Sequence, residues 1–132
     1  MMAQLPYETA LVTILDTVVE TFWGVAPQNQ ALPFVQCSLV VTTGFRHSLG
    51  PDPLHQTTVQ VDCYCASPDD RAVKRREIED TLLAVEGPVT VGADTLDIKS
   101  ITFVSGRETH ETNKDDLIYR SSQDFQITWN QE

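Results

Sequence analysis

Two pairs of strand-like segments, each divided by a polar stretch, constrain most strongly what this chain can fold into. The first pair covers residues 34–43 and 56–65, and the second covers 98–104 and 117–129. Apolar and polar side chains alternate along 56–65 and 117–129, which is typical of strands with one buried face. Each pair therefore predicts a long antiparallel hairpin, with extended loops at about 44–55 and 108–116.

Two helices are expected beside these hairpins. Apolar residues at helical spacing predict a first helix over 7–23, which ends at Gly24. Ser67 or Asp69 can cap a second helix, and Pro68 suits its first turn. The residues expected on its buried side are Ala72, Val73, Ile78, Leu82 and Val85.

The order of these elements predicts an α+β fold. It is a four-stranded, mainly antiparallel sheet built from two long hairpins, with both helices packed on one face. Residues 89–96 are also compatible with a small hairpin through residues 92–94. A chain of 132 residues is the size of one domain, 1–132.

Composition limits the classes of partner. No apolar run approaches the roughly 18 residues that a membrane span needs, and the first residues lack the pattern of an export signal. Without export, Cys37, Cys63 and Cys65 are expected to be reduced thiols. The net charge of -10 argues against binding of nucleic acid backbones. The basic cluster of residues 71–76 lies among acidic residues, which predicts i,i+4 pairs on a solvated helix face.

The sequence indicates no catalytic, cofactor-binding or metal-ligating residues, no cofactor and no enzymatic activity. Cys63-Tyr64-Cys65 suggests zinc, but zinc needs four ligands, and buried cysteines pack as small hydrophobes. The histidines follow no motif. Two acidic pairs, Asp69-Asp70 and Asp115-Asp116, suit a helix start and a turn. Phosphate loops and a nucleophile elbow are absent from the sequence.

Function is therefore expected in contacts with other proteins, made by the loops and an uncovered sheet face. The mixed-charge stretch 108–116 is either a solvated loop or an intersubunit contact in which opposite charges set register. The candidate subunit or partner contacts are Phe45, Arg46, His47, Leu49, Arg107, Glu108, His110, Glu111, Lys114, Asp115 and Asp116.

Three segments carry a family resemblance. They are Ala26-Pro27-Gln28-Asn29-Gln30-Ala31-Leu32-Pro33-Phe34-Val35, the strand 56–64, and the final hairpin from 101–103 to 119–125. With the N-terminal helix, this pattern resembles the small tail-terminator, or tail-completion, proteins of long-tailed bacteriophages. Gly50-Pro51-Asp52-Pro53 and the final loop match no motif of that family, so no residue is carried over as a contact.

The resemblance implies a structural virion protein. Such proteins form a homohexameric ring at the head-proximal end of the tail tube, where they end tube polymerisation and provide the head-joining surface. The implied partners are the tail tube protein and the head–tail connector, assembly occurs in the host cytoplasm, and no membrane is involved. DNA would pass through the ring without specific binding, past an acidic wall that repels it.

Three alternatives remain open. Another head–tail joining protein of the neck would share the fold class and differ in position. An acidic cytoplasmic adaptor would bind a basic partner and form no ring. A small enzyme or ligand-binding domain would need a convergent polar pocket, for which His47, His55, Cys63 and His110 are the candidates.

Overall fold

The computed structural model describes residues 6–27, 30–45, 54–91, 94–113 and 116–131. Two helices and six strands are present in these ranges. They are α1 (Pro6–Leu15), β1 (Thr21–Trp23), β2 (Phe34–Phe45), β3 (Leu54–Cys65), α2 (Pro68–Leu83), β4 (Gly87–Val91), β5 (Asp94–Asn113) and β6 (Asp116–Gln131).

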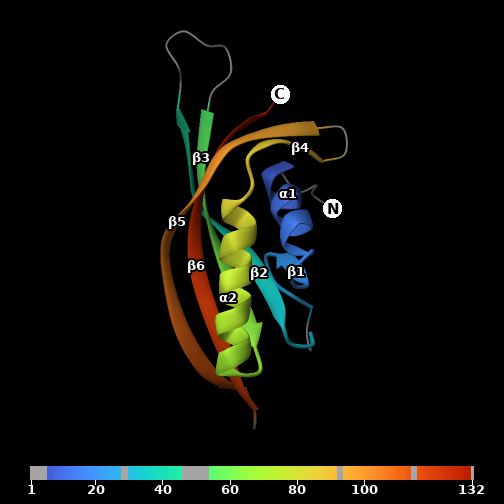
Figure 1. Ribbon diagram of the computed structural model, residues 1–132, viewed down its shortest axis with the longest axis vertical. Coiled ribbons are helices and arrows are strands. Elements are labelled where there is room, and N and C mark those ends of the chain that lie inside the picture. Colours follow the sequence, from blue (N-terminus) through green and yellow to red (C-terminus); the bar gives the residue numbers. More distant parts are fainter. Residues whose placement is uncertain (1–5, 28–29, 46–53, 92–93, 114–115, 132) are drawn as a thin grey trace.

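The strands form one six-stranded mixed sheet in the order β1-β2-β3-β6-β5-β4, and the sheet curls into a half-barrel (Figure 1). The pairs β2–β3, β3–β6, β5–β6 and β4–β5 are antiparallel, whereas β1 runs parallel to β2. The predicted four-stranded, mainly antiparallel sheet from two hairpins is therefore wrong. A short parallel strand and an additional hairpin strand extend the sheet at its two ends.

The strand β1 was missed because its sequence continues the apolar spacing of the first helix. The helix instead ends at Leu15, and the Oδ1 atom of Asp16 accepts a hydrogen bond of 2.8 Å from the backbone N–H of Thr21. This contact redirects the chain, and Thr21 then pairs with Val35. Gly24 follows with a φ of +87°, a conformation that glycine adopts without strain.

The second helix matches its prediction more closely. Ser67 caps it, with its side chain accepting a hydrogen bond from the N–H of Asp70, and Pro68 lies in the first turn. Its fully buried side chains are Ile78 and Leu82. Val73 was expected on the buried side but is 53% exposed.

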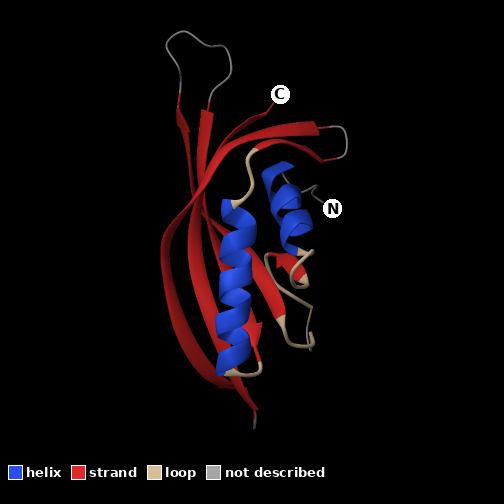
Figure 2. Ribbon diagram, viewed as in Figure 1, coloured by secondary structure: helices blue, strands red, loops and turns tan. Residues whose placement is uncertain are grey.

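Both helices lie in the hollow of the curved sheet (Figure 2). The face of the sheet toward them supplies most of the buried core, together with residues of α1 and α2. The largest fully buried side chains include Phe125, Leu11, Leu15, Ile78 and Ile127. The opposite, convex face carries the alternate residues of β3 and β6. No helix in the described ranges is long and apolar enough to cross a membrane.

The hairpins are longer than the sequence suggests. β5 and β6 stay paired to Asn113 and Asp116, so most of the loop predicted at 108–116 is strand. Similarly, Phe45 pairs with Leu54, which narrows the predicted loop 44–55 to residues outside the described ranges. Glu108 and Thr109 continue the ladder through their pairs with Ser121 and Arg120. The small hairpin predicted over 89–96 is confirmed as the β4–β5 pair.

Candidate functional site

A cluster of charged and aromatic side chains fixes the far end of the β5–β6 hairpin to α2. The carboxylate of Glu108 contacts Arg71 at 3.1 Å and Arg75 at 2.5 Å. Arg71 also donates a 2.9 Å hydrogen bond to the carbonyl of Thr109 and lies 5.4 Å from the ring centre of Tyr119. The predicted i,i+4 pairing of this basic cluster is therefore wrong for Arg71 and Arg75, which bridge to another element. The pair Lys74–Glu77 does lie along the helix, at 3.5 Å.

Neighbouring residues of this hairpin face opposite sides of the sheet. Glu108 pairs with Ser121, whose side chain is buried on the helix side. Arg107 pairs with Ser122, on the convex side, and is exposed. The two charges therefore lie on different sides of the sheet. Glu108 is paired with α2, and Arg107 is exposed on the convex side.

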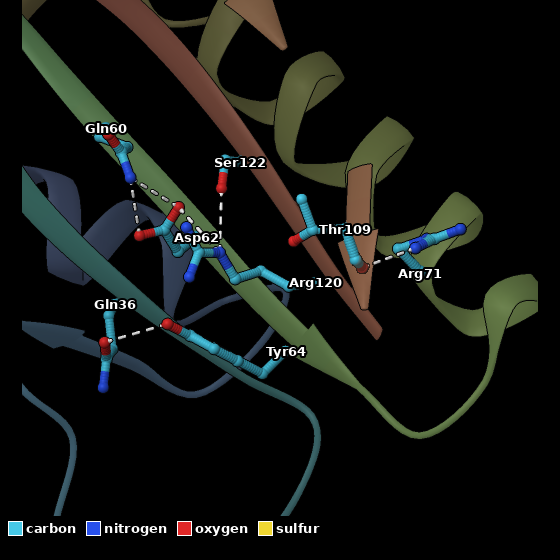
Figure 3. Close-up of polar contacts among 8 residues, drawn as sticks. All are labelled: Gln36, Gln60, Asp62, Tyr64, Arg71, Thr109, Arg120 and Ser122. Carbon is cyan, nitrogen blue, oxygen red and sulfur yellow. Dashed lines mark hydrogen bonds and ion pairs between the residues drawn. The ribbon is translucent and has the colours of Figure 1, made fainter. Parts of the chain in front are cut away.

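A polar network occupies the convex side of β2, β3 and β6 (Figure 3). Asp62 is 9% exposed and accepts two 2.9 Å hydrogen bonds from the amide of Gln60. Arg120 lies 3.9 Å from Asp62 and donates to the Ser122 hydroxyl at 3.1 Å. The guanidinium of Arg120 also lies 5.8 Å from the ring centre of Tyr64.

This network continues toward β2. The Tyr64 ring stacks on Phe34 with 4.8 Å between centroids, and its hydroxyl donates to Gln36 at 3.5 Å. The partners satisfy one another, which is the usual condition for polar groups that are partly removed from water. Such a surface is ordered before any partner arrives, and therefore suits contact with another protein.

An open hollow of about 300 Å³ lies between α2 and β5. Its lining residues are Arg75, Arg76, Glu79, Phe103, Gly106 and Gln123. Gly106 leaves room for the Phe103 ring, since a Cβ there would lie 3.1 Å from that ring. Gln123 is buried, and its Oε1 atom has no hydrogen-bond partner. The lining contains Glu79 but no serine, cysteine or histidine.

The three cysteines are free and buried, as expected for small hydrophobic residues. The sulfurs of Cys63 and Cys65 lie 3.7 Å apart on the core side of β3. The hydrogen bond to Cys65 raises the pKa of Cys63, and burial raises it further. Within the described ranges, no three histidine, cysteine or acidic residues gather as a metal site.

The predicted contact residues separate into three groups. Arg107, Glu108 and His110 are exposed strand residues, and not loop residues as predicted. Phe45, Glu111 and Asp116 lie in strands, at positions where only the backbone is described. Arg46, His47, Leu49, Lys114 and Asp115 lie outside the described residues. The end of the sheet where Phe45 pairs with Leu54 is opposite the end where Asn113 pairs with Asp116, so these two groups do not converge (Figure 1).

Sequence reasoning missed the convex-face network and the attachment of β5 to α2. The available signal for the network was Asp62, a carboxylate in the middle of an otherwise uncharged strand, 56–65. Such a residue needs a cation or hydrogen-bond donors when it is buried. No comparable signal exists for the ion pair of Glu108 with Arg71, because the two residues are brought together only by the tertiary fold.

Comparisons with known proteins add one finding. No protein-family model and no curated protein matches the chain. Among solved structures, it is similar to a chain of the "Virion of native gene transfer agent (GTA) particle", with a TM-score of 0.52 and 14% sequence identity. The match covers 91% of this chain and 84% of that chain. At this identity, the likeness shows that the two chains share a fold.

Proposed function

We propose that this chain is a non-enzymatic structural protein of a phage-like virion. The observation that supports the proposal is the shared fold with a gene transfer agent virion protein, which extends over 91% of the chain. The surfaces agree with an assembly role, because the convex face carries an ordered polar network and the far hairpin is tied to α2. A rigid, prearranged surface loses little conformational entropy when it binds a neighbour.

Within the virion, the proposed role is that of a tail terminator. Copies of the chain form a sixfold ring at the head-proximal end of the tail tube, end its polymerisation and present the head-joining surface. The partners would be the tube protein and the connector. The net charge of -10 suits a conduit through which DNA passes without being held. A ring structure with every carboxylate on its outer rim would contradict this part of the proposal.

The test is negative-stain electron microscopy of the purified protein, with and without a divalent cation, followed by addition to isolated tail tubes. The expected result is a sixfold ring with a central hole, and one ring at a single end of each tube. Capped tubes should stop growing when tube protein is added. A chain that forms no ring and leaves tube growth unchanged would contradict the terminator role.

Two further measurements separate the alternatives. A neck protein would bind isolated heads or connectors but not stop tube growth. A small ligand-binding domain would carry a bound group, so a metal assay that finds stoichiometric zinc would favour that class over the assembly role.

A further inference from the structure

The sheet has a long unpaired segment at each of its two sides. β1 pairs with β2 only at residues 35–37, and β4 pairs with β5 only at residues 94–98. In the described part of the chain, no strand covers the outer side of β2 at 38–45 or of β5 at 99–113. These segments are here called the β2 edge and the β5 edge. Each presents a row of backbone donors and acceptors that can extend a sheet.

Exposed apolar side chains lie on both edges. On the β2 edge, Leu39, Val40 and Val41 are 47%, 53% and 51% exposed. On the β5 edge, Phe103 and Val104 are 42% and 55% exposed. Because water contact with such side chains is unfavourable, covering both edges would be stabilising.

The β2 edge and residues 99–106 of the β5 edge carry little of the protection that proteins give to free strands. Residues 38–45 contain no charged residue and no proline, and residues 99–106 contain one lysine. The other charges of the β5 edge lie beyond this stretch, at Arg107, Glu108 and Glu111. Free strands are usually protected by charges, prolines or bulges, and only the bulges are prominent here, between Leu39 and Val41 and between Phe103 and Ser105. Sparse protection beside exposed valines indicates edges that are covered in the functional state.

The directions of the two edges are complementary. β2 is antiparallel to β3, β3 to β6, and β6 to β5, so β2 and β5 run in opposite directions. When a second copy continues the sheet with its helices on the same side, its β5 edge lies antiparallel to the β2 edge of the first copy. The antiparallel arrangement gives the regular ladder of hydrogen bonds.

We infer that the β2 edge of one copy pairs with the β5 edge of a second copy, which joins the two sheets into one. The occupant is a second copy because this chain itself carries two unlike edges that match in direction and in apolar character. Contacts between unlike patches are head-to-tail, and they close into a ring or continue as a filament. The edge pairing itself does not depend on the proposed function. Only its closure into a ring rests on that proposal.

The experiment compares three valine substitutions of nearly equal exposure. Val41→Lys alters the β2 edge and Val104→Lys alters the β5 edge. Val73→Lys on α2, 53% exposed and outside both edges, is the matched control. Sedimentation velocity over a wide concentration range should show self-association of the native chain and of Val73→Lys. Each edge variant alone should weaken association at least about tenfold.

Mixing the two edge variants gives the sharper result. Each variant still holds one unaltered edge, so the mixture should form heterodimers that do not grow further. A native chain that stays monomeric at every concentration would overturn the inference. Association that persists in both edge variants would also overturn it. Loss of association with Val41→Lys but not with Val104→Lys would overturn it too, because that result indicates a symmetric contact between two β2 edges.

The outcomes also separate this inference from the proposed function. Rings that are insensitive to both edge variants would leave the terminator role standing and remove the edge pairing. Assemblies that depend on both edges but do not cap tail tubes would support the edge pairing and contradict the terminator role. Thermal unfolding followed by circular dichroism shows whether each variant is folded, and Leu39→Lys or Phe103→Lys replaces an unfolded variant at the same edge.

Discussion

Cys37 lies fully buried in β2 with no disulfide partner. Burial, and then the nearby negative charge of Asp62, raises the pKa of its thiol from an ordinary 9.0 to about 12. Between these two values the unfolded chain releases the thiol proton while the folded chain keeps it. The stability that this thiol contributes is therefore fully present below about pH 9 and is lost as the pH rises toward 12.

A Cys37→Ala variant isolates this effect. Its free energy of unfolding should be lower than that of the native chain at pH 8, because a buried sulfur is removed. Between pH 8 and pH 10, the difference in unfolding free energy between the native chain and the variant should narrow by about 1.4 kcal/mol, since only the native chain carries this thiol. Urea unfolding at the two pH values measures the difference. A constant difference would show that Cys37 ionises equally well in the folded chain.

At the scale of single residues, the sequence predicts which side chains are buried better than it predicts which side chains contact one another. The alternation of residues 56–65 predicts that Cys63 and Cys65 share the core face, and both are fully buried. The same alternation gives no sign that Glu108 contacts two arginines of α2. Sequence spacing describes which face a residue occupies, whereas an ion pair between distant elements depends on the packing of those elements.

Among the elements, the hairpin of β5 and β6 contains the two longest strands, of 20 and 16 residues. Its far end has exposed residues on β5, and its attachment to α2 depends on Glu108, Arg71, Arg75 and the carbonyl of Thr109. The hydrogen bond and ion pair of Arg71 are largely shielded, because its side chain is 15% exposed. Partly shielded charged contacts are stronger than exposed ones.

Replacing Glu108 by Gln tests this attachment. The variant should lose about 1 kcal/mol of stability, mainly by local opening of the hairpin end, since each arginine loses its carboxylate. Amide hydrogen exchange of residues 107–111 should accelerate about fivefold or more, with little change in β3. Glu77→Gln breaks the more exposed Lys74–Glu77 pair and serves as the control, with under about 0.5 kcal/mol expected. Equal exchange in both variants would contradict a holding role for Glu108.

Elements with long, regular patterns follow from the sequence, and short ones do not. The strands β3 and β6 and the cap of α2 are indicated by alternation and by Ser67. β1 is three residues long and extends an apolar helical spacing, so only the tertiary contact with β2 makes it a strand. The prediction of a loop at 108–116 is wrong for residues 108–113, because charged residues occur in exposed strands as well as in turns.

For the whole molecule, the proposed assembly involves the charges near the far end of the β5–β6 hairpin. Arg107 faces outward on the convex side, near the far hairpin end, and Lys114 lies beyond the described part of that hairpin. Reversing both charges, as Arg107→Glu with Lys114→Glu, should impair ring formation or tail joining and leave the monomer folded. Opposite charges across an interface favour the correct register, and reversal replaces attraction with repulsion.

The control for this prediction reverses Lys74 and Arg76 on α2, which changes the net charge equally on a different surface. Electron microscopy counts rings and joined tails, and circular dichroism confirms folding. Normal assembly of the Arg107 and Lys114 variant would show that the far hairpin end is not part of the interface. Equal impairment in the control would indicate a general effect of charge.

The unequal coverage of the sheet has a geometric consequence for any closed assembly. β1 covers the start of β2, and β4 covers the start of β5 at the opposite end of the sheet (Figure 1). Through β3 and β6, the pairing registers place Ser38 level with Ser105 and Thr43 level with Ser100. The uncovered residues 38–43 and 100–105 therefore lie at one level of the sheet, between the two short strands. A neighbour that pairs there meets β1 at one end of the shared ladder and the β4 strand of the second copy at the other. Two short strands, of three and five residues, would then limit the length of that ladder.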